Sequence, residues 1–560
     1  MHSPRRALPF PKIPPPLARF PRLTTAGFAI MAGAIAACGF QPLSLWPLTL
    51  LGIALLLEIV SRTGTARGAL MIGWCFGLGH FTLGDNWIAT AFTYQANMPA
   101  WLGGIAVVLL SFYLAIYPAL ATLAAWLVIR PDRARAAGRS GTGTFLALVL
   151  AFASAWIVTE WMRAWVFTGF AWNPIGIALL GQFQTRGLAL VTPWIGTYGL
   201  SGLLVLLAGL PGLFLRAGMH ATTAPRRWIW ALPALAIAAA LSALMIEPDP
   251  WVRREEGAVR FTLVQPDLRQ EIVDDPRYYE ANFLKLARLS LPRTPGEKRV
   301  VFWPESGLGD YLRDGYPPYL YRLYTFGADP MIARERIGSV IGPYGLLLTG
   351  AVDLVMKDDE GIAARNSVTA IDGKGDIVAG YSKAHLVPFG EYLPLRWLLE
   401  PLGASRFVAG ALDFWPGPGP RTYDLGAWGE AGIQICYEIV FSGEVVDPLN
   451  RPDYIYNPSN DGWFGAWGPP QHLAQARLRA IEEGLPVLRS TTNGISAVID
   501  ADGIVRAAVP RHVAQRIDGR IPPPHEPTPF ARYGNALPLI FAALLGLAAL
   551  SMVALRRPRR

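Results

Sequence analysis

The sequence predicts a multi-pass α-helical membrane domain of about eight transmembrane helices, with an α/β domain inserted before the last helix. Of the 560 residues, 52% are hydrophobic and 16% are charged, a balance outside the range of ordinary soluble domains. Apolar runs of roughly 20 residues, the length needed to cross a bilayer, recur along the chain. Between the last two runs, strand-like segments alternate with helix-like ones, which indicates an α/β domain.

The apolar runs contain few charged residues. We expect transmembrane helices at residues 24–41, 44–60, 69–93, 102–129, 144–164, 188–215, 228–246 and 536–555. The chain accordingly divides into a basic N-terminal segment (1–23), a seven-helix membrane domain (24–246), a linker (247–257), an α/β domain (258–528), a final transmembrane helix (536–555) and a basic tail (556–560).

The formal net charge of +9 does not indicate nucleic-acid binding, because the basic residues do not gather on one soluble domain with interleaved aromatics. They lie at the ends of alternate apolar runs, whereas residues 39–43 and 93–100 contain no lysine or arginine. By the positive-inside rule both termini are cytoplasmic and the α/β domain lies on the opposite side. The first run also resembles a cleaved signal peptide, but six further runs follow it, so we expect it to be retained.

The chain has three cysteines, and two of them, Cys38 and Cys75, fall inside predicted transmembrane helices. Cys436 is alone in the α/β domain. One thiol cannot build a disulfide framework or a cysteine metal cluster. We expect neither a metal nor an organic cofactor. A lone cysteine in an oxidising compartment is either buried and inert or present for its reactivity.

The α/β domain has recognisable strands, helices and hairpins. Apolar runs of strand length occur at Phe261–Gln265, Val300–Trp303, Leu346–Thr349 and Gly432–Cys436. Helices are expected at Tyr278–Leu291 and Gln471–Glu483. Asp-Gly turns predict two hairpins, Ser367–Ile371 with Ile377–Gly380 and Ser496–Ile499 with Ile504–Val509.

Three polar residues attract attention for their chemistry, although each has an ordinary structural interpretation. Glu305, after a predicted strand, would cap the next helix; Lys383, in a loop, would be solvated; and Cys436, at a strand end, would be a small buried hydrophobe. Together they meet the needs of a thiol that attacks an acyl carbon, namely a base for its proton and a positive group for the oxyanion. A carboxylate raises the pKa of a nearby thiol, so Glu305 is better interpreted as a proton acceptor during attack.

The motifs around these residues resemble a known family. They read Trp-Pro-Glu-Ser at 303–306, YSKAHLVPFGEYLP at 381–394 and ICYEIVF at 435–441, with further matches at 459–465, 468–472 and 489–494. In this order they resemble the nitrilase superfamily and, more closely, the apolipoprotein N-acyltransferase family. The similarity covers nearly the whole chain, including the apolar runs before and after the α/β domain.

The resemblance implies an α-β-β-α sandwich for the α/β domain and a role for each matching residue. Glu305 would be the general base, Lys383 the oxyanion and orientation residue, and Cys436 the nucleophile. Glu391 would support Lys383 and Cys436, while Tyr437 and Glu438 would be needed beside the nucleophile. Relatives carry a tryptophan after the first strand of this domain, whereas residues 268–275 contain none, so that part of the substrate pocket is lined differently here.

The implied reaction transfers an acyl chain from a phospholipid, through a thioester on the cysteine, to the N-terminal α-amino group of S-diacylglyceryl-cysteine lipoproteins. The resemblance further implies phosphatidylethanolamine as donor, diacylglyceryl apolipoproteins as acceptors, and a bacterial inner-membrane location with the α/β domain in the periplasm. We expect a monomer.

Other interpretations remain open from the sequence. One is a membrane-tethered carbon-nitrogen hydrolase (amidase), and another is a non-catalytic membrane transporter or scaffold. A Cys–His protease would need His385 or His472 beside the thiol, but neither has the surrounding signature of such enzymes. Glu160 and Arg163, three residues apart within a predicted transmembrane helix, are expected to pair on one helix face.

Overall fold

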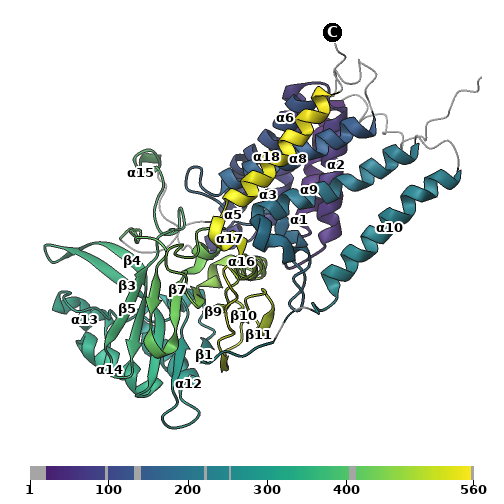
Figure 1. Ribbon diagram of the computed structural model, residues 1–560. Coiled ribbons are helices and arrows are strands. Elements are labelled where there is room, and N and C mark those ends of the chain that lie inside the picture. Colours follow the sequence, from purple (N-terminus) through teal and green to yellow (C-terminus); the bar gives the residue numbers. More distant parts are fainter. Residues whose placement is uncertain are drawn as a thin grey trace, which may run out of the picture.

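The computed structural model describes residues 21–94, 99–130, 141–219, 224–250, 252, 254–402 and 412–555. Most of the expected basic N-terminal segment and the basic tail at 556–560 therefore lie outside the described residues. The chain forms a bundle of long helices and, beside it, two β-sheets flanked by shorter helices (Figure 1). The sequence prediction of a helical membrane domain joined to an α/β domain is confirmed.

Helices occur at every expected membrane span. They are α1 (Pro21–Ala37), α2 (Trp46–Arg62), α3 (Ala66–Gly84), α5 (Trp101–Leu114) continued by α6 (Ile116–Ile129), α8 (Thr142–Arg163), α9 (Thr192–Met219), α10 (Ala224–Ile246) and α18 (Ala536–Ala554). Within the described ranges, four helical stretches are long and apolar enough to cross a bilayer: Trp101–Ile129, Thr142–Arg163, Leu188–Gly218 and Ala536–Ala554. A total of about eight spans stays a prediction.

Two expected spans differ in detail from the helices observed. The third ends at Gly84 instead of reaching residue 93, because polar residues follow: Asp85 occupies the C-cap, and the Asn86 side chain donates to the carbonyl of Leu83 at 2.7 Å. The sixth is interrupted near its start by Gly196, whose φ of +64° is non-helical. A Cβ at Gly196 would lie 2.4 Å from the ring of Phe530, so a larger residue does not fit there.

Glycines allow α1 and α3 to pack with their backbones in contact. A Cβ added to Gly33 of α1 would lie 1.9 Å from the carbonyl oxygen of Phe76, and one added to Gly79 of α3 would lie 2.0 Å from that of Ile30. Small residues serve this purpose in membrane helices, where close van der Waals packing replaces the hydrophobic effect as the force between helices.

The α/β domain is built on two six-stranded sheets. The first has the order β12-β1-β2-β3-β4-β5 and the second β11-β10-β9-β8-β7-β6. The strands of the first sheet are β1 (Arg260–Gln265), β2 (Arg299–Phe302), β3 (Gly345–Lys357), β4 (Glu360–Asp372), β5 (Ile377–Ser382) and β12 (Gln515–Arg520). Those of the second are β6 (Thr422–Asp424), β7 (Glu430–Ile433), β8 (Tyr454–Ser459), β9 (Val487–Thr491), β10 (Ser496–Ile499) and β11 (Val505–Val509).

The two sheets pack face to face between outer layers of helices. Phe302 of one sheet contacts Tyr454 and Tyr456 of the other in a shared apolar core. Helices α12 (Tyr279–Ser290) and α14 (Pro330–Ile341) cover the outer face of the first sheet, and α16 (Gly468–Glu483) covers that of the second. This is the expected α-β-β-α sandwich.

Helix α16 lies between the second sheet and the membrane bundle (Figure 1). It is buried along nearly its whole length, and a single apolar cluster extends from the bundle through α16 to the sheet. After the α/β domain, α18 returns to the bundle and packs against α8 and α9, where the Ser154 hydroxyl donates to the carbonyl of Ala542 at 2.8 Å. The catalytic candidates are therefore held beside the membrane domain from two directions.

The strand directions bring several strand ends to one edge of the sandwich. β2 is parallel to β3, and β5 is parallel to both because β4 is antiparallel to each of its neighbours. In the second sheet β7, β8 and β9 are parallel. Residues that follow β2, β5, β7 and β8 consequently meet at the carboxyl ends of the strands, where α/β domains place their sites.

The contact between α1 and α3 predicts that alanine substitutions at two glycines of α1 differ in their effect on protein stability. Gly33→Ala should lower stability by about 1–3 kcal/mol, because the new methyl forces the two backbones apart. Gly27→Ala is the matched control, since a Cβ there meets nothing within 4 Å. Thermal unfolding in detergent, followed by circular dichroism, should show a lower midpoint for Gly33→Ala alone. Equal midpoints for the two variants would contradict the close contact.

Candidate active site

Cys436 lies at the start of a 3-10 helix, Cys436–Val440, directly after the second sheet. The sequence prediction that it ends a strand is wrong, because β7 stops at Ile433 and the backbone turns. Cys436 has a φ of +52°, a conformation that side chains rarely adopt and that surrounding contacts must stabilise. One such contact is the amide of Ile435, which donates to Glu438 Oε2 at 2.7 Å.

Glu305 follows β2 and is buried, with 5% of its surface exposed. It does not cap a helix, since the next helix begins only at Pro318. Its carboxylate accepts one hydrogen bond from the Asn366 side chain and one from the amide of Asn460, both at 2.7 Å. These two donors come from different sheets, so Glu305 lies where the two sheets meet.

Lys383 follows β5 and is 1% exposed, so the ordinary interpretation of a solvated lysine is wrong. Its Nζ lies 2.9 Å from Oε2 of Glu391 and 3.8 Å from Oε1 of Glu305. Burial alone would lower the pKa of Lys383, but the carboxylates of Glu391 and Glu305 outweigh it and raise the pKa above its usual value. The ammonium is therefore a fixed positive charge.

Glu391 holds the lysine in place. Besides the ion pair, its carboxylate accepts a hydrogen bond from the amide of Val387 at 2.7 Å and one from the Asn366 side chain at 2.9 Å. Asn366, in the middle of β4, thus donates to both carboxylates that face Lys383. No sequence pattern pointed to Asn366, which is a single polar residue in a long strand.

The thiol of Cys436 lies beside both charged groups. Burial raises its pKa well above the usual value, Glu305 raises it further through its charge and a hydrogen bond with the thiol, and Lys383 opposes this effect. The sulfur is therefore protonated near neutral pH, with a proton acceptor in contact and a cation nearby. This arrangement suits attack concerted with proton transfer, rather than a stored thiolate.

Glu438 connects the loop that carries Lys383 to the loop that carries Cys436. Its Oε1 accepts hydrogen bonds from the Tyr381 hydroxyl at 2.7 Å and from the amides of Ala384 at 2.7 Å and His385 at 3.1 Å, while Oε2 accepts from Ile435. Burial raises the pKa of Glu438 to about 7, and these donors counteract it. Glu438 thus fixes the distance between the two loops.

Tyr437 faces the membrane domain. Its hydroxyl lies 3.4 Å from the carbonyl oxygen of Gly169, and its ring is nearly parallel to that of Trp172, with centroids 6.4 Å apart. The residues adjoining the nucleophile therefore form part of the boundary between the two domains.

Neither histidine forms a Cys–His pair with the thiol. His472 Nε2 lies 3.0 Å from the backbone carbonyl oxygen of Cys436, and the His385 ring stacks on Phe441, with its Nε2 3.4 Å from the carbonyl oxygen of Thr168. In the part of the chain that the structure describes, no group of three or more His, Cys, Asp or Glu side chains is arranged to hold a metal ion.

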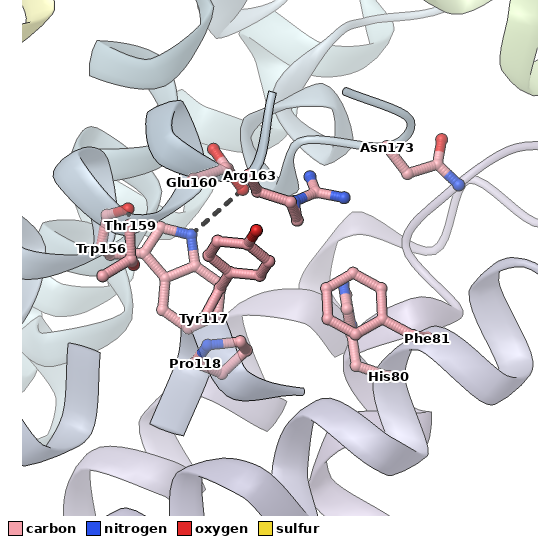
Figure 2. A pocket seen from close by; sticks show the side chains of 9 residues that line it. All are labelled: His80, Phe81, Tyr117, Pro118, Trp156, Thr159, Glu160, Arg163 and Asn173. Carbon is pink, nitrogen blue, oxygen red and sulfur yellow. Dashed lines mark hydrogen bonds between the residues drawn. The ribbon is translucent and has the colours of Figure 1, made fainter. Parts of the chain in front are cut away.

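A small polar cavity lies in the membrane bundle. Figure 2 shows Glu160, Arg163 and Asn173 around it, with His80 and Tyr117 on the facing helices. The expected pairing of Glu160 with Arg163 is wrong. Glu160 instead accepts from the Trp156 indole at 3.2 Å and the Ile175 amide at 2.8 Å, and Arg163 donates to the carbonyl of Trp172 at 2.8 Å. These polar groups fix the segment after α8, which underlies Tyr437.

Comparison with known proteins gives two matching family models. The model "Apolipoprotein N-acyltransferase N-terminal domain" matches residues 32–210, and the model "Carbon-nitrogen hydrolase" matches residues 280–522. The chain is 34% identical over 543 residues to the apolipoprotein N-acyltransferase of Rhodopseudomonas palustris, which covers 93% of this chain and 94% of that one. It is 33% identical over 555 residues to that of Bradyrhizobium diazoefficiens, covering 95% of each chain.

Among solved structures, an amidase of the nitrilase superfamily from Nesterenkonia matches with 16% identity, covering 49% of this chain and 93% of that one, at a TM-score of 0.33. The assignment of the fold rests on the family model for the α/β domain and on the two packed sheets.

The raised pKa of the Cys436 thiol predicts slow, pH-dependent alkylation. Iodoacetamide should modify Cys436 more slowly than a free thiol at about pH 7.5, and the rate should rise roughly tenfold per pH unit without a plateau up to about pH 9, because only the thiolate reacts. Mass spectrometry of the Cys436 peptide measures the rate. Protein unfolded in denaturant, whose thiol titrates normally, is the control.

Replacing the carboxylate of Glu305 tests the cause of the raised pKa of Cys436. Glu305→Gln removes the negative charge that raises the pKa of the thiol, so alkylation at about pH 7.5 should become several-fold faster. A slower rate in Glu305→Gln would contradict this electrostatic assignment.

Proposed function

The chain belongs to the apolipoprotein N-acyltransferase family, and on that premise we propose that Cys436 carries an acyl chain from a phospholipid to the N-terminal amine of a lipoprotein. It is an acyltransferase with a nitrilase-superfamily domain and membrane helices. Membership of this family implies lipid and lipoprotein substrates. The proposal concerns the residues, the order of steps, the identity of the donor and the orientation in the membrane.

The first half-reaction forms a thioester. Cys436 Sγ attacks the ester carbonyl carbon of the phospholipid while its proton passes to Glu305, and the oxyanion forms near Lys383 and the Tyr437 amide. The ester C–O bond then breaks, and the proton on Glu305 passes to the departing lyso-phospholipid oxygen. The acyl chain remains on sulfur and Glu305 is again ionised.

The second half-reaction forms an amide. The α-amino group of the S-diacylglyceryl cysteine attacks the thioester carbonyl carbon and loses a proton to Glu305. The C–S bond breaks, and the sulfur takes that proton to regenerate the thiol. Because the first product leaves before the second substrate reacts, the kinetics are ping-pong.

The observation that carries the proposal is the buried cluster of Glu305, Lys383 and Cys436. It combines a protonated thiol, a proton acceptor and a fixed ammonium. Glu391, Tyr437 and Glu438 have supporting roles, since they hold the lysine and fix the loop of the nucleophile. Water is a competing acyl acceptor, and burial of the cluster limits its access.

We further propose phosphatidylethanolamine as the donor, diacylglyceryl apolipoproteins as the acceptors, and a monomeric enzyme. The membrane domain spans residues 24–246, the linker 247–257 and the catalytic domain 258–528, with the last transmembrane helix at 536–555. The basic segments at 1–23 and 556–560 face the cytoplasm, and the catalytic domain faces the periplasm of a bacterial inner membrane.

Mass spectrometry of the purified enzyme tests the two half-reactions. Incubation with phosphatidylethanolamine should add one acyl mass to the Cys436 peptide, and a diacylglyceryl-cysteine peptide should then remove that mass and gain it on its amine. If the acyl group is released only as fatty acid, a membrane-tethered hydrolase is the better assignment. If no acyl-enzyme forms, the donor or the thioester mechanism is wrong.

Substitutions test the three roles. Cys436→Ala should abolish the acyl-enzyme, Glu305→Gln should slow its formation by about 10²–10⁴-fold, and Lys383→Met by about 10²–10³-fold. Lys374→Met, at an exposed lysine in the turn between β4 and β5, is the matched control and should leave the rate unchanged. A Cys436→Ala protein that retains full function would favour a transporter or scaffold.

The orientation has its own test. Reporter fusions at position 555 should be active only with a cytoplasmic reporter, and fusions within the α/β domain only with a periplasmic one. The reverse pattern would overturn the proposed topology.

A further inference from the structure

Two adjacent side chains on the first turn of α16 point to different domains. Gln471 and His472 are both fully buried, each with 0% of its surface exposed. Gln471 contacts the membrane domain and His472 contacts the backbone of the nucleophile. Helix α16 itself lies between the bundle and the second sheet (Figure 1).

The amide of Gln471 is fully used by the membrane domain. Its Oε1 accepts from the Trp172 indole at 2.9 Å and from the Asn173 side chain at 2.8 Å. Its Nε2 donates to the carbonyl of Gln41 at 3.0 Å and to that of Gly84 at 3.1 Å. These partners belong to the loop after α1, the end of α3 and the segment after α8. One side chain therefore fixes α16 against three separate parts of the bundle.

His472 holds the carbonyl of Cys436 through a buried polar chain. A carbonyl only accepts, so Nε2 carries the proton and donates across 3.0 Å. Nδ1 then accepts from Arg489 Nη2 at 2.9 Å, and it also lies 3.2 Å from Asp461 Oδ1. The Arg489 guanidinium binds both oxygens of Asp461 at 2.8 Å. Burial and the Arg489 charge lower the pKa of His472 to about 4, so the ring is neutral. This fixes the tautomer that donates to Cys436.

The hydrogen bond from His472 to the carbonyl of Cys436 sets the direction of the Tyr437 N–H. In a trans peptide the C=O and the following N–H lie on opposite sides, so a carbonyl held on the α16 side directs the Tyr437 N–H away from α16. The first N–H groups of a helical turn have no acceptor within it and remain available to a ligand. The strained φ of Cys436, +52°, makes such an external constraint necessary.

We infer that Gln471 and His472 are positioning residues that couple the membrane domain to the nucleophile. Gln471 sets the position of α16 relative to the bundle that presents the lipid, and His472 transmits that position to the Cys436–Tyr437 peptide. The inference rests on the proposed thioester chemistry, and it makes two separable claims. Loss of His472 impairs acylation by any ester, whereas loss of Gln471 impairs acylation by a lipid held in the bilayer.

The test measures single-turnover acylation of Cys436 in the full-length protein in nanodiscs. One donor is phosphatidylethanolamine in the bilayer and the other is water-soluble 4-nitrophenyl butyrate. Gln471→Met removes all four hydrogen bonds at similar volume. Gln475→Met is the matched control, because Gln475 lies one turn further along α16 and is 1% exposed. Among the described residues, its side chain forms a hydrogen bond only with the carbonyl of Gln471, at 3.5 Å.

Two variants isolate the histidine contact. His472→Phe keeps a ring for its aromatic neighbours but removes the donor, and it should slow acylation by both esters about 100-fold, the usual effect of a lost oxyanion donor. His472→Gln places an amide N–H near the position of Nε2 and should restore the rate to within about tenfold of wild type.

Gln471→Met should slow acylation by the lipid about tenfold or more and change acylation by the soluble ester by less than about threefold. Only the lipid is held by the bundle, so only its ester depends on the position of α16 relative to the bundle. Gln475→Met should change neither. If Gln471→Met fails to fold, Trp172→Phe, which removes one of the four hydrogen bonds of Gln471 and keeps an aromatic ring at this position, should show the same preference for the soluble ester to a smaller degree.

Wild-type rates in His472→Phe, or equal changes in Gln471→Met and Gln475→Met, would overturn the inference. If wild-type Cys436 is acylated by the soluble ester but not by the lipid, the proposed function fails, while the two His472 variants still decide the claim about His472. The Gln471 claim is then decided by hydrogen exchange of residues 436–440. Exchange should be faster in Gln471→Met and unchanged in Gln475→Met.

Discussion

The buried ammonium of Lys383 and its two carboxylates, Glu391 and Glu305, form the interaction on which the rest of the site depends. An unpaired charge is very unfavourable in such an interior, so each of the three is acceptable only while the others stay in place. Asn366 donates to both carboxylates and fixes their separation. Burial and the charge of Glu305 together raise the pKa of the Cys436 thiol, which remains protonated beside this acceptor.

The boundary between the two domains combines an apolar cluster with buried hydrogen bonds. Arg477 donates to the carbonyls of Gly181, Gln182 and Thr185, and Glu482 accepts from the amide of Thr197, next to the break in α9. These backbone groups belong to the membrane domain, and their partners belong to α16. A polar interface of this kind specifies one relative position, because a shift leaves buried donors and acceptors unpaired. Cys436 is therefore held at a defined position beside the bundle.

Much of this arrangement could be predicted from the sequence. Apolar runs located the strands, and Asp-Gly turns located both hairpins. Glu305 and Lys383 were recognisable because they follow strands. The turn at Cys436 was not, since a positive φ at a non-glycine residue depends on distant contacts. Nor was the burial of α16: the pattern of Gln471–Glu483 predicts a helix, but its polar residues are buried only because the membrane domain covers them.

The return of α18 to the bundle has a consequence for biogenesis. The residues of α18 that contact α8 and α9 are synthesised after the whole α/β domain. The bundle therefore reaches its final form only once the domain between α10 and α18 has been made. The position of α18 at the end of the chain thus couples completion of the helix bundle to synthesis of the α/β domain.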